Sequence, residues 1–145
     1  MQISKVEKRT PMLINQLLEV WEDSVRETHL FLSDSEIQSI KKYVPQALRD
    51  IEKLIAAEEN HIPIAFMGIR GRKLEMLFIR SDKRGRGLGR KLLQYGMDIY
   101  QINELTVNEQ NPAARGFYEH LGFEVVKRTE SDEQGNPYPL LYMKK

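Results

Sequence analysis

The sequence contains no cysteine, and this absence excludes several kinds of site at once. Without cysteine there are no disulfide bonds, no thiolate ligands for a metal ion and no thiol nucleophile. Any chemistry that the protein performs must therefore use other groups.

An excess of charge of either sign is also missing. The chain has 22 Lys and Arg against 21 Asp and Glu, so its formal net charge is +1. Such a balanced chain has no global field that would attract nucleic acid or an anionic membrane. A polyanion would have to bind at a local basic patch.

Long apolar segments are absent as well. No apolar run approaches the roughly 20 residues of a membrane-spanning helix. The first residues, Met1 to Lys5, are not followed by the apolar core of a signal peptide. We expect a soluble cytoplasmic protein that does not bind membranes.

Nothing in the composition divides the chain into parts. There is no internal repeat, no low-complexity tract and no linker rich in Pro, Gly and Ser. A chain of this length is near the commonest domain size and buries roughly 68–70% of the surface that it exposes when unfolded. We therefore expect one domain over residues 1–145.

Apolar residues recur at helical spacing in the N-terminal third of the chain. They predict one helix over residues 11–27. Ser33 and Glu36 have the spacing of a capping box, and the helical pattern that follows continues to Ile51. Pro45 should kink or split this second helical region.

The remainder alternates short strands and helices. Residues 53–58, 63–69 and 74–79 are predicted strands joined by short turns, which indicates an antiparallel meander. The elements predicted after them are a helix from 88, a strand at 105–107, a helix at 113–121 and strands at 123–127 and 140–143. This order predicts an α+β domain built around one mixed sheet.

A glycine-rich, basic turn joins the strand at 74–79 to the helix that starts at Leu88. It reads Arg84-Gly85-Arg86-Gly87-Leu88-Gly89-Arg90. Glycines allow several backbone N–H groups to point toward one ligand, and the N-terminus of a helix carries partial positive charge. Because the arginines add local positive charge, the turn favours a phosphate ligand.

Two common nucleotide-binding motifs do not fit this turn. A P-loop requires Gly-Lys followed by Ser or Thr, which is not present. A dinucleotide fingerprint would require a glycine where Arg90 or Leu92 stands. The alternative for a glycine-rich loop taken alone is a flexible turn with a solvated basic face. That alternative must also account for four cations at the start of a helix, which are Arg84, Arg86, Arg90 and Lys91.

A second segment runs from a predicted strand into a capped helix. Asn111 and Pro112 form a helix start, and Gly122 is a natural helix stop. Tyr118 lies on or near the buried face of this helix, so its hydroxyl group needs a partner or a function.

With both motifs in this order, the sequence resembles the GNAT superfamily of acyl-CoA-dependent N-acetyltransferases and is similar to small bacterial members of undefined acceptor. The resemblance is carried by Arg84-x-x-Gly87-x-Gly89 and by Asn111-x-x-Ala114-x-x-Phe117-Tyr118-x-x-x-Gly122-Phe123, and it covers about residues 63–127. It implies a three-layer fold with a central mixed, mostly antiparallel sheet of six to seven strands flanked by about four helices.

The resemblance also implies an activity, in which acetyl-CoA donates an acetyl group to a primary amine that attacks the thioester directly, without a metal ion. The strand at 105–107 would splay away from its neighbour and leave a V-shaped slot for the pantetheine arm. The glycine-rich turn would hold the pyrophosphate, and Asn111 resembles a residue that contacts the coenzyme. The implied coenzyme-binding residues are Leu77, Phe78, Ile79, Arg84, Gly85, Arg86, Gly87, Leu88, Gly89, Arg90 and Asn111.

Two side chains are the predicted catalytic residues. A lysine-type amine has a pKa of about 10.4 and must lose a proton before it attacks a thioester. Glu75, on the strand that leads to the turn, is the candidate base, directly or through water; the alternative is an exposed strand carboxylate. Tyr118 resembles the family's tyrosine that protonates the departing thiolate. A backbone N–H near Phe78 or Ile79 would stabilise the carbonyl oxygen.

The acceptor end is less clearly marked in the sequence. Trp21, His29 and Tyr138 are candidates for acceptor contacts, although a helical Trp is usually a core residue and a lone His is usually packed or exposed. The acceptor could be a small molecule or a peptide or protein amine, and the protein could be a monomer or a homodimer. The competing hypothesis is a catalytically silent acyl-CoA-binding sensor or regulatory module. Nucleic-acid binding is disfavoured because no aromatic side chains accompany the arginines.

Overall fold

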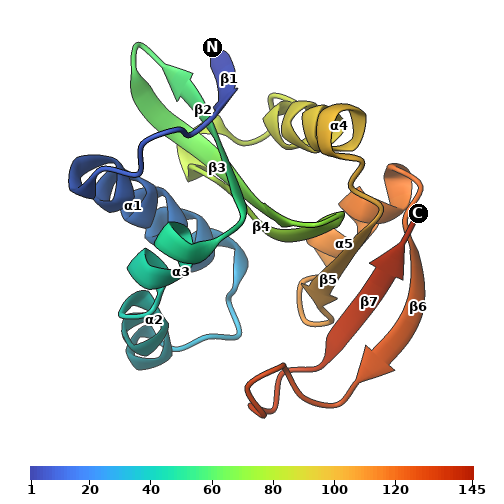
Figure 1. The fold of residues 1–145 in the computed structure, drawn as a ribbon. Helices are drawn as coiled ribbons and strands as arrows, with labels where there is room; N and C mark the ends of the chain where they lie inside the picture. Colours follow the sequence, from blue (N-terminus) through green and yellow to red (C-terminus); the bar gives the residue numbers. More distant parts are fainter.

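Seven strands form one mixed sheet, in the order β1-β2-β3-β4-β5-β7-β6, in the computed structural model, which describes residues 1–145 (Figure 1). Only the β4–β5 pair is parallel. The predicted mixed, mostly antiparallel sheet is therefore confirmed. The strands are β1 (Gln2–Lys5), β2 (Lys53–Glu59), β3 (Ile62–Arg70), β4 (Lys73–Ile79), β5 (Glu104–Asn108), β6 (Glu124–Thr129) and β7 (Leu140–Lys144).

Helices cover both faces of this sheet. Helices α1 to α3 lie on one face, and α4 and α5 lie on the other (Figure 1). The buried side chains accordingly form two clusters, one of 11 residues on the α1 side and one of 17 residues on the α4 and α5 side. The helices are α1 (Pro11–Thr28), α2 (Asp34–Lys41), α3 (Val44–Asp50), α4 (Leu88–Tyr100) and α5 (Pro112–His120), with one 3₁₀ turn, η1 (Ser81–Lys83).

The helix starts follow the sequence signals. The Thr10 side chain accepts a hydrogen bond from the Leu13 N–H at 3.2 Å, and Ser33 and Glu36 form both bonds of the capping box, at 3.2 and 3.0 Å. The predicted second helical region is split into α2 and α3, with Pro45 in the first turn of α3. No helix has both the length and the apolar character that crossing a membrane requires.

Strand β1 is the one strand that the sequence did not indicate. It lies at the edge of the sheet beside β2, and of its four residues only Ile3 is partly buried. A strand this short and this exposed has no alternation of apolar and polar side chains that could be recognised in advance.

Strand β4 carries two irregularities that open the sheet. It pairs with β5 only at Lys73 with Glu104 and at Leu74 with Leu105, so the two strands diverge beyond Leu74. On its other side, the register with β3 shifts so that Glu75 is the extra residue of a β-bulge. A V-shaped slot between β4 and β5 results, as the resemblance implied.

Candidate active site

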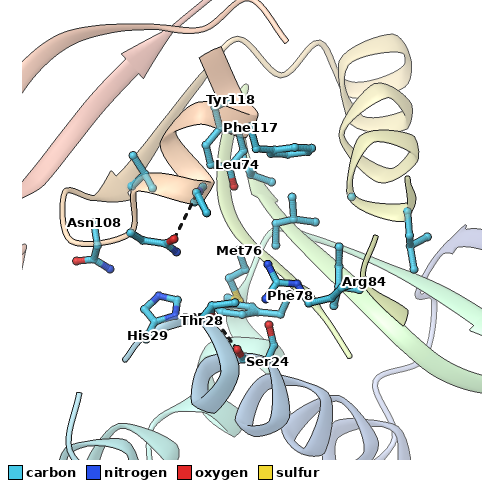
Figure 2. A pocket seen from close by; sticks show the side chains of 18 of the residues that line it. Ser24, Thr28, His29, Leu74, Met76, Phe78, Arg84, Asn108, Phe117 and Tyr118 are labelled. Atoms are coloured by element: carbon cyan, nitrogen blue, oxygen red, sulfur yellow. Dashed lines mark hydrogen bonds between the residues drawn. The ribbon is translucent and has the colours of Figure 1, made fainter. Parts of the chain in front are cut away.

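A cavity of about 520 Å³ lies in the slot between β4 and β5. Its walls come from β4, the glycine-rich turn, the start of α4, β5, α5 and the C-terminal end of α1. The two sequence motifs, which are separated along the chain, therefore share one cavity. In Figure 2, Phe117 and Tyr118 lie at one end of the view and Ser24, Thr28 and His29 at the other.

The glycine-rich turn presents a row of free backbone donors to this cavity. From Gly85 to Arg90, six successive N–H groups make no hydrogen bond within the protein. Gly85 and Gly87 have φ angles of 76° and 74°, a left-handed conformation that glycine adopts without strain. Unpaired N–H groups at a helix start form a site for an anion.

The charges of the turn are also unneutralised. Arg84 and Arg90 line the cavity, whereas Arg86 does not. None of these arginines pairs with a carboxylate, although the neighbouring Lys83 pairs with Glu59 at 2.9 Å. The turn therefore keeps its positive charge for a ligand.

The glycine-rich turn and the η1 residues before it lie close to α1, β4 and α5. Asp23 of α1 accepts hydrogen bonds from the backbone N–H of Ser81 at 2.6 Å and from its hydroxyl at 3.1 Å. A Cβ atom on Gly89 would lie 3.1 Å from the Ile79 Cδ1 atom and 3.5 Å from Phe117. Glycine at this position therefore allows α4 to start close to both β4 and α5.

Strand β4 offers unpaired backbone groups along the slot. The Arg80 N–H donates to the Ile64 carbonyl oxygen at 2.9 Å, and bonded positions alternate in an antiparallel pair. Phe78 therefore bonds toward β3, while the N–H and C=O groups of Leu77 and Ile79 point into the slot. The resemblance implied that a backbone N–H group near Phe78 or Ile79 stabilises the carbonyl oxygen of the thioester. On this strand, only the N–H groups of Leu77 and Ile79 point toward the slot and could do so.

Tyr118 brings a hydroxyl group to the cavity from α5. The side chain is only 9% exposed, and its hydroxyl makes no hydrogen bond with the protein. Every fully buried side-chain polar atom in the structure has a hydrogen-bond partner. Because the Tyr118 hydroxyl has none, it is not fully buried, and it is open to the cavity that Tyr118 lines. Burial raises the pKa of the Tyr118 hydroxyl above its usual range, so at neutral pH the group can donate a proton but cannot accept one as a phenolate.

The model of the family described as "Acetyltransferase (GNAT) domain" matches residues 21–145 of the chain. The chain belongs to the GNAT acetyltransferase family. This GNAT acetyltransferase transfers an acetyl group from acetyl-CoA to an amine, and acetyl-CoA is its co-substrate.

Named relatives and solved structures agree with this assignment. The peptidyl-lysine N-acetyltransferase YjaB of Salmonella typhimurium is 36% identical over 126 residues, which are 87% of each chain. The solution structure of apo YjaB from Escherichia coli has 36% identity and a TM-score of 0.87, over 99% of this chain and 97% of that one. A Thermoplasma acidophilum PaiA N-acetyltransferase structure with coenzyme A shares the fold, at 22% identity and a TM-score of 0.72 over the full length of both chains.

The predicted base of this GNAT acetyltransferase lies at the bulge of β4. Glu75 lines the cavity, and its side chain is 26% exposed. Its carboxylate lies 3.9 Å from the Lys73 ammonium group, which also lies 3.6 Å from the Glu133 carboxylate. Glu75 therefore shares one cation with a second carboxylate at the edge of the slot.

The three candidates for acceptor contacts are placed differently. Trp21 is 5% exposed and does not line the cavity, because its position in the helical repeat turns it to the apolar face of α1; it is a core residue rather than an acceptor contact. His29 lines the cavity. Tyr138 lies outside the lining, and its ring is 5.5 Å from that of Phe31, which lies 5.5 Å from the His29 ring.

Several cavity residues of the GNAT acetyltransferase were not predicted from the sequence. Ser24 and Thr28 lie at i and i+4 on the inner side of α1, and both line the cavity. Small polar residues that interrupt an apolar helical stripe are a signal that could have found them. The other unpredicted lining residues are Leu74, Met76, Lys83, Thr106, Val107, Asn108, Ala113, Ala114, Phe117 and Leu140.

Proposed function

We propose that this GNAT acetyltransferase acetylates the side-chain amine of lysine residues in peptides or proteins. The acceptor class is supported by the YjaB relatives, which are named peptidyl-lysine N-acetyltransferases and match 87% of this chain. The observation that carries the proposal is a cavity lined from both faces of the sheet. His29 reaches it from the α1 face, and Tyr118 reaches it from the α5 face. A donor and an acceptor can therefore meet in the slot from opposite sides.

In this proposal the glycine-rich turn binds the coenzyme pyrophosphate. Of the six free N–H groups between Gly85 and Arg90, the five that belong to cavity-lining residues donate to its oxygens, and the guanidinium groups of Arg84 and Arg90 add charge-assisted bonds. Arg86 contributes only to the local field, since it does not line the cavity. Leu88 is buried at the helix start and contributes its backbone N–H.

The pantetheine arm is proposed to lie along β4, where the backbone groups of Leu77 and Ile79 are unpaired on the slot side. Such an arm pairs with the strand much as a neighbouring strand would. The Phe78 side chain packs against the core cluster on the α1 side of the sheet, which is the proposed acceptor side. Tyr118 then donates a proton to the departing thiolate, because its hydroxyl is protonated and open to the cavity.

Asn111 allows a test of coenzyme binding with a matched control. Its Oδ1 atom caps α5 by accepting the Ala114 N–H at 3.3 Å, which leaves its amide NH₂ group free at the cavity wall. Asn111→Ser keeps an N-cap oxygen but loses the NH₂ donor, and Asn111→Ala loses both. We expect both variants to bind acetyl-CoA about 3- to 10-fold more weakly.

Only Asn111→Ala is expected to lower the free energy of unfolding, by about 1 kcal/mol, since serine is a good N-cap and alanine is not. Calorimetric titration with acetyl-CoA and urea unfolding measure the two effects separately. Wild-type affinity in both variants would remove Asn111 from the coenzyme site.

The remaining proposals concern the chain as a whole. We propose that residues 1–145 act as one N-acetyltransferase domain, since a single sheet runs from β1 to β6. A cytoplasmic location, the absence of nucleic-acid partners, and the choice between monomer and homodimer stay predictions.

The proposed acceptor is tested with a panel of amines. Thiol release from acetyl-CoA is measured with a lysine peptide blocked at its N-terminus, with the same peptide carrying arginine instead, and with a polyamine. We expect release with the lysine peptide alone, together with the mass increase of one acetyl group. Release with the polyamine alone would overturn the acceptor class, and binding of acetyl-CoA without release for any amine would favour the silent module.

A further inference from the structure

We propose that His29 is the group that takes the proton from the acceptor amine, and that Thr28 positions it by fixing its tautomer. The inference rests on the proposed lysine acceptor and names the base that this reaction needs. It assigns to His29 the role that the sequence suggested for Glu75.

The tautomer follows from a short chain of hydrogen bonds at the end of α1. The Thr28 hydroxyl donates to the Ser24 carbonyl oxygen at 2.8 Å (Figure 2). The same hydroxyl oxygen lies 2.8 Å from Nδ1 of His29. A hydroxyl has one hydrogen, and here the Ser24 carbonyl receives it, so Nδ1–H of the imidazole must be the donor in the second bond. The neutral ring then carries its free lone pair on Nε2.

The position of the ring is fixed from three sides. The His29 backbone N–H closes α1 by donating to the Val25 carbonyl oxygen at 2.8 Å. The imidazole ring lies 5.5 Å from the Phe31 ring and 6.5 Å from the Phe78 ring of β4. His29 is therefore half-buried over the open strand, on the α1 face of the slot, and it lines the cavity.

Burial and a nearby positive charge keep this imidazole neutral. Burial is the larger cause and the Arg84 charge the smaller one, and together they hold the pKa of His29 below its usual range. Arg84 is the charged group that acts on the ring from across the cavity, whereas the neighbouring faces are the aromatic rings of Phe31 and Phe78. A histidine with a lowered pKa is unprotonated at neutral pH, which is the form a base requires.

Coenzyme binding should strengthen this base. If Arg84 pairs with the pyrophosphate, its positive charge opposes protonation of His29 less, so the smaller of the two causes that lower the pKa of the imidazole is removed while burial remains. The proton affinity of the base thus increases once the acetyl donor is in place.

Glu75 is less suited to the same task. Its carboxylate already lies beside the Lys73 ammonium group at 3.9 Å, and this cation is shared with Glu133 at 3.6 Å, whereas no charged side chain pairs with the His29 ring.

The proposed step balances in protons and bonds. One proton of the acceptor ammonium group passes to Nε2 of His29, and the neutral nitrogen forms the C–N bond with the thioester carbon. The C–S bond then breaks, and the thiolate takes the Tyr118 proton. Tyr118 is reprotonated through solvent by the second proton that the amide nitrogen loses. The imidazolium releases its proton to water, so the products are the amide, the thiol and one proton.

The first test is kinetic and uses the lysine peptide at saturating acetyl-CoA. His29→Gln should lower kcat about 100- to 1,000-fold with little change in KM, because a general base contributes to the chemical step. Between about pH 5 and 8 the acidic limb of the wild-type rate profile should disappear in this variant. Thr28→Val should give a smaller loss, about 5- to 10-fold, since it removes the hydrogen bond that orients the His29 ring, together with the bond to the Ser24 carbonyl oxygen. His120→Gln, an exposed change of the same type, should match the wild type.

The second test does not depend on the acceptor and keeps the two proposals apart. Nitrogen chemical shifts of the His29 ring in the wild-type protein should report the Nδ1–H tautomer, and coenzyme A should raise the pKa of this ring, but not in an Arg84→Gln variant. The opposite tautomer, or kcat of His29→Gln within about 3-fold of the wild type against the general-base expectation, would overturn the role of His29. A wild type that acetylates no lysine peptide but has the expected tautomer and pKa shift would overturn only the acceptor.

Discussion

Replacing Tyr118 by phenylalanine is expected to lower kcat about 100- to 1,000-fold and to leave the affinity for acetyl-CoA nearly unchanged. The change removes one hydroxyl group that is open to the cavity and makes no hydrogen bond within the protein. Burial raises the pKa of this hydroxyl, so the group is protonated at neutral pH and can donate a hydrogen bond or a proton to the departing thiolate. Steady-state assays with the lysine peptide measure the loss in kcat, and calorimetry measures the affinity.

The Tyr118 hydroxyl has no hydrogen-bond partner in the protein, so its removal should leave the free energy of unfolding unchanged. Because no hydrogen bond is lost, Tyr118→Phe should unfold at the same urea concentration as the wild type. Tyr95→Phe on α4 is the matched control, since that ring is partly buried in the same core cluster but does not line the cavity. Equal kcat values for the two variants would remove Tyr118 from the chemical step.

Reversing the charge of Arg84 is expected to weaken acetyl-CoA binding about 10- to 100-fold. Hydrogen bonds to charged groups contribute about 1.5–3 kcal/mol, and each 1.4 kcal/mol corresponds to about a factor of ten in affinity. Arg84 lines the cavity and has no carboxylate partner, so Arg84→Glu removes an available charge and adds a repulsive one. Calorimetric titration at two salt concentrations measures both the loss and its screening.

Arg86→Glu changes the net charge of the same turn by the same amount, but its side chain does not line the cavity. We expect it to weaken binding much less, and to lose most of its effect in high salt, because charges that are not in contact are screened by ions. If Arg86→Glu weakened binding as much as Arg84→Glu, the turn would act through its overall field and not through placed contacts.

The local structure of the proposed coenzyme half of the site could be predicted from the sequence because its signals are local. The conformation of the turn follows from glycines within a few positions of one another, two of which have positive φ angles. The cap at Asn111 likewise depends on the residues that follow it directly. Hydrogen bonds and steric limits between near neighbours leave a pattern in the residues themselves, so this half could be recognised without coordinates.

The acceptor half could not be predicted in the same way, because its contacts join distant segments. The His29 ring at the end of α1 lies 6.5 Å from the Phe78 ring of β4, and this contact depends on how α1 packs against β3 and β4. Helical spacing alone left the side of α1 that faces the cavity undetermined, so Trp21 was a candidate beside His29, although a helical Trp is usually a core residue. Packing separates the two residues. The apolar stripe of α1 places Trp21 in the core, whereas His29 lines the cavity.

The sequence by itself determined the kind of protein, namely an α+β acetyltransferase with a glycine-rich, basic turn and a tyrosine on the later helix that Asn111 caps. Tertiary structure alone decided which groups meet across the slot. The divergence of β4 and β5 beyond Leu74 exposes backbone groups, and the end of α1 brings His29 over them. The physical reason is that turns and caps depend on neighbouring residues, whereas a cavity depends on where whole helices pack against the sheet.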